Sequence, residues 1–157
     1  MNILAIDLGT TTGWAMCNRA GAVIGGSESF SPKRCGGYGQ RWLAFRQWLG
    51  ELNTAGEIHA VYYEDVKRHE GVLAAHAYGG FLAHLEAWCA LHRIPLKPVG
   101  VGEVKKHWTG KGNANKEGMI ATAKAKGFHP VDDNHADALA ILSYAREQEQ
   151  PLEECAF

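Results

Sequence analysis

Apolar positions along the chain follow two different periods, and the first is that of a buried strand. Residues 2–8 are apolar apart from Asn2 and Asp7, so this segment has no polar face and is typical of a strand covered on both sides of a sheet. After a turn at Gly9–Gly13, residues 14–17 and 22–30 read as a second and a third strand, separated by a turn at Ala20-Gly21. Such an order predicts a three-stranded antiparallel meander.

The period becomes helical after a predicted loop at residues 31–39. Apolar residues between 40 and 52 fall on one face, which predicts a helix packed on the sheet and ended by Gly56. A strand at 58–63, a helix rich in small residues at 72–91 and a short strand at 94–99 follow. Pro95 and Pro98 place that last strand at an edge. Two further helices are predicted at 116–126, capped by Asn115, and from 132–133 to 145.

Length and composition favour one soluble globular domain. The chain has 157 residues, of which 46% are hydrophobic and 21% charged. A formal net charge of −1 argues against a strongly basic nucleic-acid coat, although it leaves room for a local basic patch. We expect the domain to span 1–147 and residues 148–157 to form an acidic tail. The polar, acidic segment from residue 146 onward is expected to fray.

The cysteines and the apolar runs narrow the cellular setting. The 4 cysteines are far apart and form no C-x-x-C pair, which predicts reduced thiols rather than a disulfide or zinc framework. We find no apolar run of membrane-spanning length and no secretory signal, so we expect a cytoplasmic protein that does not bind a membrane.

Acidic residues follow two of the predicted strands and enter the last helix. Asp7 ends the first strand, and Glu64 follows the strand at 58–63. Asp137 lies inside the apolar segment Ala136–Leu142, and Asp133 lies four residues earlier on the same helical face. Three of these positions have an ordinary alternative explanation, since Asp7 could cap a turn, Glu64 could lie at a solvated strand end, and Asp132 or Asp133 could cap the helix. Helix capping does not explain Asp137, which lies a full turn inside the helix.

Together the carboxylates point to divalent cations. Carboxylates brought close to one another repel and raise each other's pKa unless a cation holds them. Oxygen ligands suit Mg²⁺, with Mn²⁺ as a substitute, rather than zinc. Two such ions about 3.5–4 Å apart can activate a water and stabilise the leaving oxygen in phosphodiester cleavage.

Basic residues gather in segment 101–116, around a turn rich in glycine and asparagine. Backbone amides and lysines in this arrangement suit phosphates, and the segment does not match a nucleotide P-loop. Two further basic pairs are Lys67-Arg68, which follow Glu64, and Lys33-Arg34, which lie in the 31–39 loop. This loop is either a mobile basic flap or a simple polar connection. The candidate DNA-binding residues are Lys105, Lys106, Lys111, Lys116, Lys67, Arg68, Lys33 and Arg34.

Four motifs in order resemble those of the RuvC family of Holliday junction resolvases, in particular its shorter phage and prophage-type members. They are Ala5–Gly9, Tyr63–Val66, Val104-Lys105 with Gly110-x-Gly112-x-Ala114-x-Lys116, and Ala136–Ile141. The resemblance implies an α/β, ribonuclease-H-like fold, with a five-stranded mixed sheet flanked by helices. It implies a crossover junction endodeoxyribonuclease that works as a homodimer through helix 72–91, with four-way DNA junctions as partner and no nucleotide cofactor. The metal ligands would be Asp7, Glu64, Asp137 and a fourth residue, and a phage-encoded protein would act in the cytoplasm of its bacterial host.

The fourth ligand departs from the family pattern, which places it three residues before the last aspartate, at Asn134. Helical geometry favours Asp133, which shares the face of Asp137 better than His135 does. Asn134 could contribute through its carbonyl oxygen or a bridging water. Some family members also insert an aromatic side chain at the junction centre, and the candidates here are Tyr38, Tyr78 and Trp108.

Other functions remain as alternatives. A related nuclease could act on RNA or on other branched DNA, since sequence does not set junction selectivity. A non-catalytic nucleic-acid-binding module would keep the basic segment but has no need of the three separated acids. Residues 7–11 also resemble the phosphate-binding turn of actin-like ATPases, but the chain has neither a second such domain nor a second glycine-rich phosphate motif.

Overall fold

A five-stranded mixed sheet forms the centre of the molecule. The computed structural model describes residues 1–150, and the sheet has the strand order β3-β2-β1-β4-β5. The strands β1 (Ile3–Asp7), β2 (Thr11–Cys17) and β3 (Val23–Ser29) form the predicted antiparallel meander. The strands β4 (Ala60–Asp65) and β5 (Leu96–Gly100) continue the sheet parallel to β1, and β5 occupies the edge. The predicted fold class is therefore confirmed.

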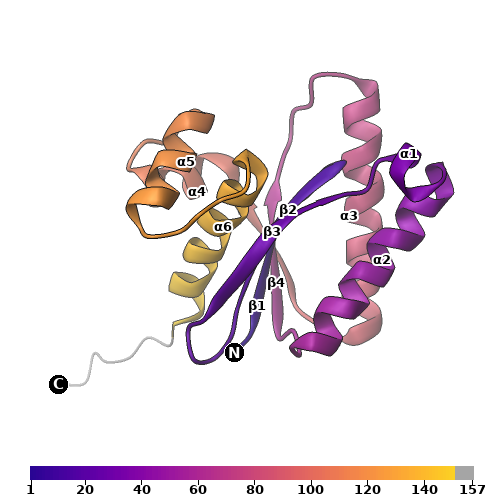
Figure 1. The fold of residues 1–157 in the computed structure, drawn as a ribbon, viewed down its shortest axis with the longest axis horizontal. Coiled ribbons are helices and arrows are strands. Elements are labelled where there is room, and N and C mark those ends of the chain that lie inside the picture. The colour runs from indigo at the N-terminus through magenta and orange to yellow at the C-terminus, as the bar shows by residue number, and fades with distance from the viewer. Residues whose placement is uncertain (151–157) are drawn as a thin grey trace.

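Helices cover both faces of the sheet (Figure 1). One face carries α1 (Pro32–Cys35), α2 (Tyr38–Ala55) and α3 (Val72–His92), and the other carries α4 (Val101–Thr109), α5 (Lys116–Ala125) and α6 (Asp133–Glu149). Leu4 and Ile6 of β1 pack into the first layer, whereas Ile3 and Ala5 pack into the second. The central strand is thus buried on both sides, as its unbroken apolar run predicts. No helix within residues 1–150 is long and apolar enough to cross a membrane.

Small residues in α3 bring it close to α2. A Cβ atom added at Gly80 would lie 2.3 Å from the ring of Trp42, so this contact requires glycine. The close approach predicted for this helix is therefore made, at Gly80, to a helix of the same chain. Gly79 has no neighbour within 4 Å of such a Cβ and lies on the exposed side of α3.

Two segments predicted as loops contain helices. In the 31–39 segment, Ser31 caps the short helix α1, whose first residue is Pro32, and α2 already begins at Tyr38. In the 101–116 segment, Val101–Thr109 forms α4, which buries Val104 and Trp108 on one face. Only two large residues of that segment, Val104 and Trp108, are buried at helical spacing. The lysines and glycines around them make the sequence look like a polar loop.

The last helix is longer than predicted, since it runs to Glu149 instead of ending at Ala145. The carboxylate of Glu149 accepts a hydrogen bond from the hydroxyl of Tyr62 at 2.7 Å and pairs with Lys97. Residues 146–149 are therefore helical, and the prediction that they fray is wrong. Residues 151–157, which hold most of the predicted acidic tail, lie outside the described residues.

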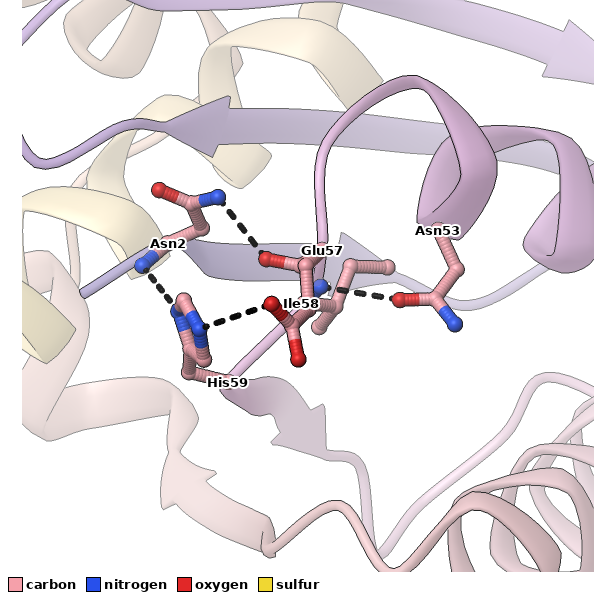
Figure 2. Close-up of polar contacts among 5 residues, drawn as sticks. All are labelled: Asn2, Asn53, Glu57, Ile58 and His59. Carbon is pink, nitrogen blue, oxygen red and sulfur yellow. Dashed lines mark hydrogen bonds and ion pairs between the residues drawn. The ribbon is translucent and has the colours of Figure 1, made fainter.

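Polar contacts fix the chain between α2 and β4 to the start of β1 (Figure 2). The backbone amide of Asn2 donates to Nδ1 of His59 at 2.8 Å, and the Asn2 side-chain amide donates to the carbonyl oxygen of Glu57 at 2.8 Å. Asn53 accepts a hydrogen bond from the backbone amide of Ile58 at 2.9 Å. These bonds hold β4 next to β1, and this pairing positions the site described next.

Candidate active site

The register of β1 and β4 brings Asp7 and Glu64 side by side. Ile6 pairs with Tyr63 in this parallel ladder, so the next residues along the two strands are Asp7 and Glu64. Side chains alternate between the faces of a sheet, and Ala5 and Tyr62 lie in the core on the α6 side. Asp7 and Glu64 consequently both face α6.

The N-terminus of α6 is fixed against β2 and β3. The carboxylate of Asp132 caps the helix by accepting from the backbone amide of His135 at 2.8 Å, and it also accepts from the hydroxyl of Ser27 at 2.6 Å. Gly13 of β2 lies so close that an added Cβ would be 1.9 Å from the carbonyl oxygen of Asn134. The first two turns of α6, with Asp133 and Asp137, are thereby held over the acids of the sheet.

Asp7, Glu64, Asp133 and Asp137 lie close enough for the charge of one acid to act on another, and Asp132 also raises the pKa of Asp7. Burial raises the pKa of Asp7 well above its ordinary value, and Glu64, Asp137 and Asp133 raise it further. Burial also raises the pKa of Glu64, against the opposing effect of Lys105. For Asp137, burial and the charges of Glu64 and Asp133 raise the pKa to about 7. In the absence of a cation, the cluster therefore holds protons that isolated carboxyl groups would lose.

The donor chemistry of the cluster fits a hard divalent cation. The six ion pairs within residues 1–150 include Asp133 but leave out Asp7, Glu64 and Asp137. Buried carboxylates without a positive partner are costly, and a cation would remove that cost. Among the described residues, no three His, Cys, Asp or Glu side chains already converge on one point, so coordination requires these side chains to rotate toward a common centre.

Two of the three candidates for the fourth ligand, Asp133 and His135, have different surroundings, and the backbone of the third, Asn134, lies against Gly13 of β2. Asp133 forms an ion pair with Lys116 at 3.3 Å and contributes to the raised pKa of Asp7. His135 is buried, its Nδ1 accepts from the backbone amide of Val131 at 3.1 Å, and its Nε2 packs against Gly25 of β3. Since Nδ1 of His135 accepts a hydrogen bond and Nε2 lies against β3 at Gly25, the geometry favours Asp133 over His135.

The structure separates the predicted basic residues into two groups. Lys105 on α4 and Lys116 at the start of α5 act on the acid cluster, because their charges lower the pKa of Asp137. Lys106 and Lys111 lie on α4 and just after it. The other four lie on the opposite layer or on loops. Lys33 and Arg34 lie on α1, and Lys67 and Arg68 lie between β4 and α3. Lys67 pairs with Asp65 at 3.7 Å, and Arg34 pairs with Glu28 at 3.7 Å.

The aromatic candidates also differ in exposure. Trp108 and Tyr78 are core residues, with 4% and 8% of their surface exposed, whereas Tyr38 is 75% exposed. The Tyr78 hydroxyl donates to the carbonyl oxygen of Glu64 at 2.8 Å and accepts from the backbone amide of Val66 at 3.1 Å. This clamp on the end of β4 was not predicted, since no sequence pattern links a tyrosine in a helix to a strand end that lies 14 residues earlier.

Comparisons with known proteins place the fold. No protein-family model and no curated protein matches the chain. The structure of Thermus thermophilus RuvC in complex with a Holliday junction substrate matches with a TM-score of 0.78 at 24% identity, over 94% of this chain and 96% of that one. T. thermophilus RuvC alone matches with a TM-score of 0.72 at 24% identity, over 94% of this chain and 97% of that one. The yeast mitochondrial Holliday junction resolvase Ydc2 matches with a TM-score of 0.57 at 16% identity, over 90% of this chain and 75% of that one. The chain therefore has the ribonuclease-H-like fold of the RuvC resolvases.

Proposed function

We propose that the protein is a structure-selective DNA endonuclease that hydrolyses phosphodiester bonds at four-way junctions with the help of divalent cations. The observation that carries this proposal is the cluster of Asp7, Glu64, Asp133 and Asp137, drawn from two neighbouring strands and one helix, with two lysines beside it. The fold supports it, because a Holliday junction is the substrate in the T. thermophilus RuvC complex.

The side chains have distinct roles in this proposal. Asp7, Glu64 and Asp137 would hold Mg²⁺, and Asp133 would complete a site for two ions, where Mn²⁺ could substitute. When bound, the ions supply an activated water and stabilise the leaving oxygen. Lys105 and Lys116 hold the anionic strand next to the acids. Lys116 pairs with Asp133 at 3.3 Å, and a cation held by Asp133 would leave this lysine available for a phosphate.

A homodimer through α3 would present two such sites to one junction. The buried side of this helix consists of Tyr78, Phe81, Leu85, Trp88 and Cys89. Its other side exposes Gly79, Ala83, Ala87 and Ala90 at helical spacing. A stripe of small residues lets two helices approach closely, which supports α3 as the subunit contact.

A nicking assay on a mobile four-way junction tests the function. The junction, a matched linear duplex, a branched three-way DNA and an RNA–DNA hybrid are each incubated with the protein in Mg²⁺, in Mn²⁺ and in chelator. We expect cleavage of the junction in either metal, none in chelator, and little cleavage of the duplex. Equal cleavage of junction and duplex would overturn junction selectivity, and preferential cleavage of the hybrid would indicate a nuclease for RNA.

A further inference from the structure

A cleft lies on the other side of the sheet, between the N-terminal ends of α2 and α3. Its volume is about 390 Å³, and its lining includes Thr10, Tyr38, Arg41, Trp42 and His76. Figure 1 shows the first turns of α2 and α3 at the same end of the molecule. Thr10 belongs to the turn that follows Asp7, so the cleft adjoins the edge of the sheet that carries the acid cluster.

Arg41 is a buried charge without an acidic partner. Only 6% of its surface is exposed, and none of the six ion pairs within residues 1–150 includes it. Its Nε donates to the carbonyl oxygen of Phe30 at 3.0 Å, and its Nη2 donates to the hydroxyl of Thr10 at 2.7 Å. Two neutral acceptors hold the guanidinium in place, and no carboxylate of the described residues forms an ion pair with it.

Arg41 keeps a donor, Nη1, that no acceptor within residues 1–150 uses. Every fully buried side-chain nitrogen and oxygen of the described residues has a partner, so an atom without one must be exposed to some extent. Nη1 is therefore accessible, and the cleft that Arg41 lines is where that access lies. The rings of Trp42 and Phe81 lie 5.1 and 5.2 Å from the guanidinium carbon and fix its orientation.

The surroundings of Arg41 favour an anion. None of the residues that line the cleft carries a carboxylate, and His76 and Thr10 add further donors. The first turns of α2 and α3, helices of 18 and 21 residues, carry the positive ends of their dipoles. A planar guanidinium with free N–H groups matches the geometry of a phosphate group.

We infer that this cleft binds a phosphate of a DNA strand, with Arg41 as its principal ligand. The inference rests on the proposed function for the identity of the strand, but the phosphate site itself stands on the cleft and on Arg41. The exposed ring of Tyr38 and the half-buried ring of Trp42 offer apolar surface for the sugar or base next to the phosphate. The strand would thus be held on both sides of the edge that carries Asp7.

The first experiment needs neither DNA nor metal. The full chain, labelled with ¹⁵N, is titrated with inorganic phosphate in chelator, while the Nε–Hε signals of Arg41 and Arg46 are followed by NMR. Arg46 is the matched control, since it lies on the same helix and does not line the cleft. We expect a saturable shift of the Arg41 signal and no comparable shift for Arg46. No shift at Arg41 would overturn the phosphate site, whatever the protein does to DNA.

The second experiment asks whether the phosphate belongs to DNA. Kd for a four-way junction is measured in chelator at several salt concentrations for the unchanged protein, Arg41→Gln, Ala74→Glu and the control Arg46→Gln. Each substitution lowers the net charge by one. Ala74→Glu keeps Arg41 and places a carboxylate in the cleft, so it covers the case in which Arg41→Gln fails to fold.

The two outcomes separate clearly. Loss of one phosphate contact lowers the slope of log Kd against log salt by about 0.9. We expect this loss for Arg41→Gln and Ala74→Glu, together with a several-fold weaker Kd at low salt, and a smaller change for Arg46→Gln. If all three variants keep the slope of the unchanged protein while phosphate still shifts Arg41, the DNA assignment is wrong. If the unchanged protein does not bind junctions, the proposed function fails and the phosphate titration still decides the site.

Discussion

Asp7 carries a burial cost that only its neighbours explain. It extends from a central strand toward a helix that brings two more acids, and Glu64 lies next to it on β4. A polar turn residue at this position would gain from hydrogen bonds, whereas Asp7 has four acidic neighbours that raise its pKa. The arrangement is unfavourable for the folded chain alone, and the proposed cation would offset that cost.

Replacing Asp7 with asparagine should separate cleavage from binding. The amide is nearly the same size as the carboxylate but cannot supply the negative charge that a cation needs. We expect Asp7→Asn to reduce junction nicking below detection and to leave the Kd for the junction within a few-fold of its original value. Nicking and fluorescence anisotropy measure the two effects. Asp65→Asn, one residue after Glu64 and paired with Lys67, is the matched control and should keep its activity.

The metal-free protein should lose stability as the pH rises. The pKa of Asp137 is about 7 in the folded protein, against an ordinary value of 3.8. Between these values the folded state holds a proton that the unfolded state has lost, so the free energy of unfolding falls with rising pH. The loss is at most about 1.4 kcal/mol per pH unit for this one group, from about pH 4 to about pH 7.

Thermal unfolding between pH 5 and pH 8, in chelator and in Mg²⁺, measures this dependence. Mg²⁺ should stabilise the protein more at pH 8 than at pH 5, because protons and cations compete for the same carboxylates. Asp137→Asn should have a flatter pH dependence in chelator than the unchanged protein. An unchanged slope in that variant would mean that Asp137 is ionised throughout.

At the scale of secondary structure, the contact between β2 and α6 positions the site. Gly13→Ala would place a Cβ 1.9 Å from the backbone of Asn134, and backbone cannot rotate away as a side chain can. We expect α6 to shift, with a loss of roughly 1–3 kcal/mol in the free energy of unfolding and a large loss of nicking. Gly26→Ala on β3 is the control, since its Cβ would lie 3.6 Å from Trp14, which is ordinary contact. Chemical unfolding and the nicking assay measure the two effects. If Gly13→Ala and Gly26→Ala lost the same stability and the same nicking activity, the contact between Gly13 and α6 would not position the site.

The elements and the acids of the site follow from sequence patterns to different degrees. The unbroken apolar run of β1 and the cap at Asn115 predict their elements well, because burial and capping are local. The helix α4 was not predicted, because it buries only two residues, Val104 and Trp108, and these are separated by lysines and a histidine. The continuation of α6 depends on contacts of Glu149 with Tyr62 and with Lys97, which lie 87 and 52 positions away in the sequence.

The candidate site shows the same limit. Asp7 and Glu64 could be anticipated because each ends an apolar strand, and Asp137 because it interrupts an apolar helix face. The choice between Asp133 and His135 needed the fold, since the packing of His135 against Gly25 joins residues far apart in the sequence. Arg41 gave no signal at all, because in the sequence it resembles any basic residue on the polar face of a helix.

Over the whole molecule, the two helical layers divide the work. The α4–α6 layer completes the acid cluster, while the α2–α3 layer carries the Arg41 cleft and the exposed small-residue stripe of α3. Tyr78 connects the layers, since it lies on α3 and holds the backbone of Glu64 and Val66. A subunit contact through α3 would therefore act on the end of β4 that carries Glu64, a proposed metal ligand.

This connection makes the proposed dimer testable by one substitution. Ala83 lies at the centre of the exposed stripe, and an arginine there would place a bulky charge where two helices need to approach closely. We expect Ala83→Arg to sediment as a monomer under conditions in which the unchanged protein is a dimer. Its paired cutting of a junction, in which both strands are nicked within one binding event, should fall with dimerisation.

Ala55→Arg is the control, since Ala55 is exposed at the far end of α2 and the added charge is the same. Thermal unfolding tells loss of assembly from loss of fold, because an exposed alanine on a helix can be replaced by arginine at little cost to the monomer. If Ala83→Arg remains a dimer, α3 is not the subunit contact, and the second active site at the junction must be presented by another surface. If Ala83→Arg is a monomer that still makes single nicks in a junction, the cluster around Asp7 is complete within one chain. The dimer would then serve to pair the two nicks.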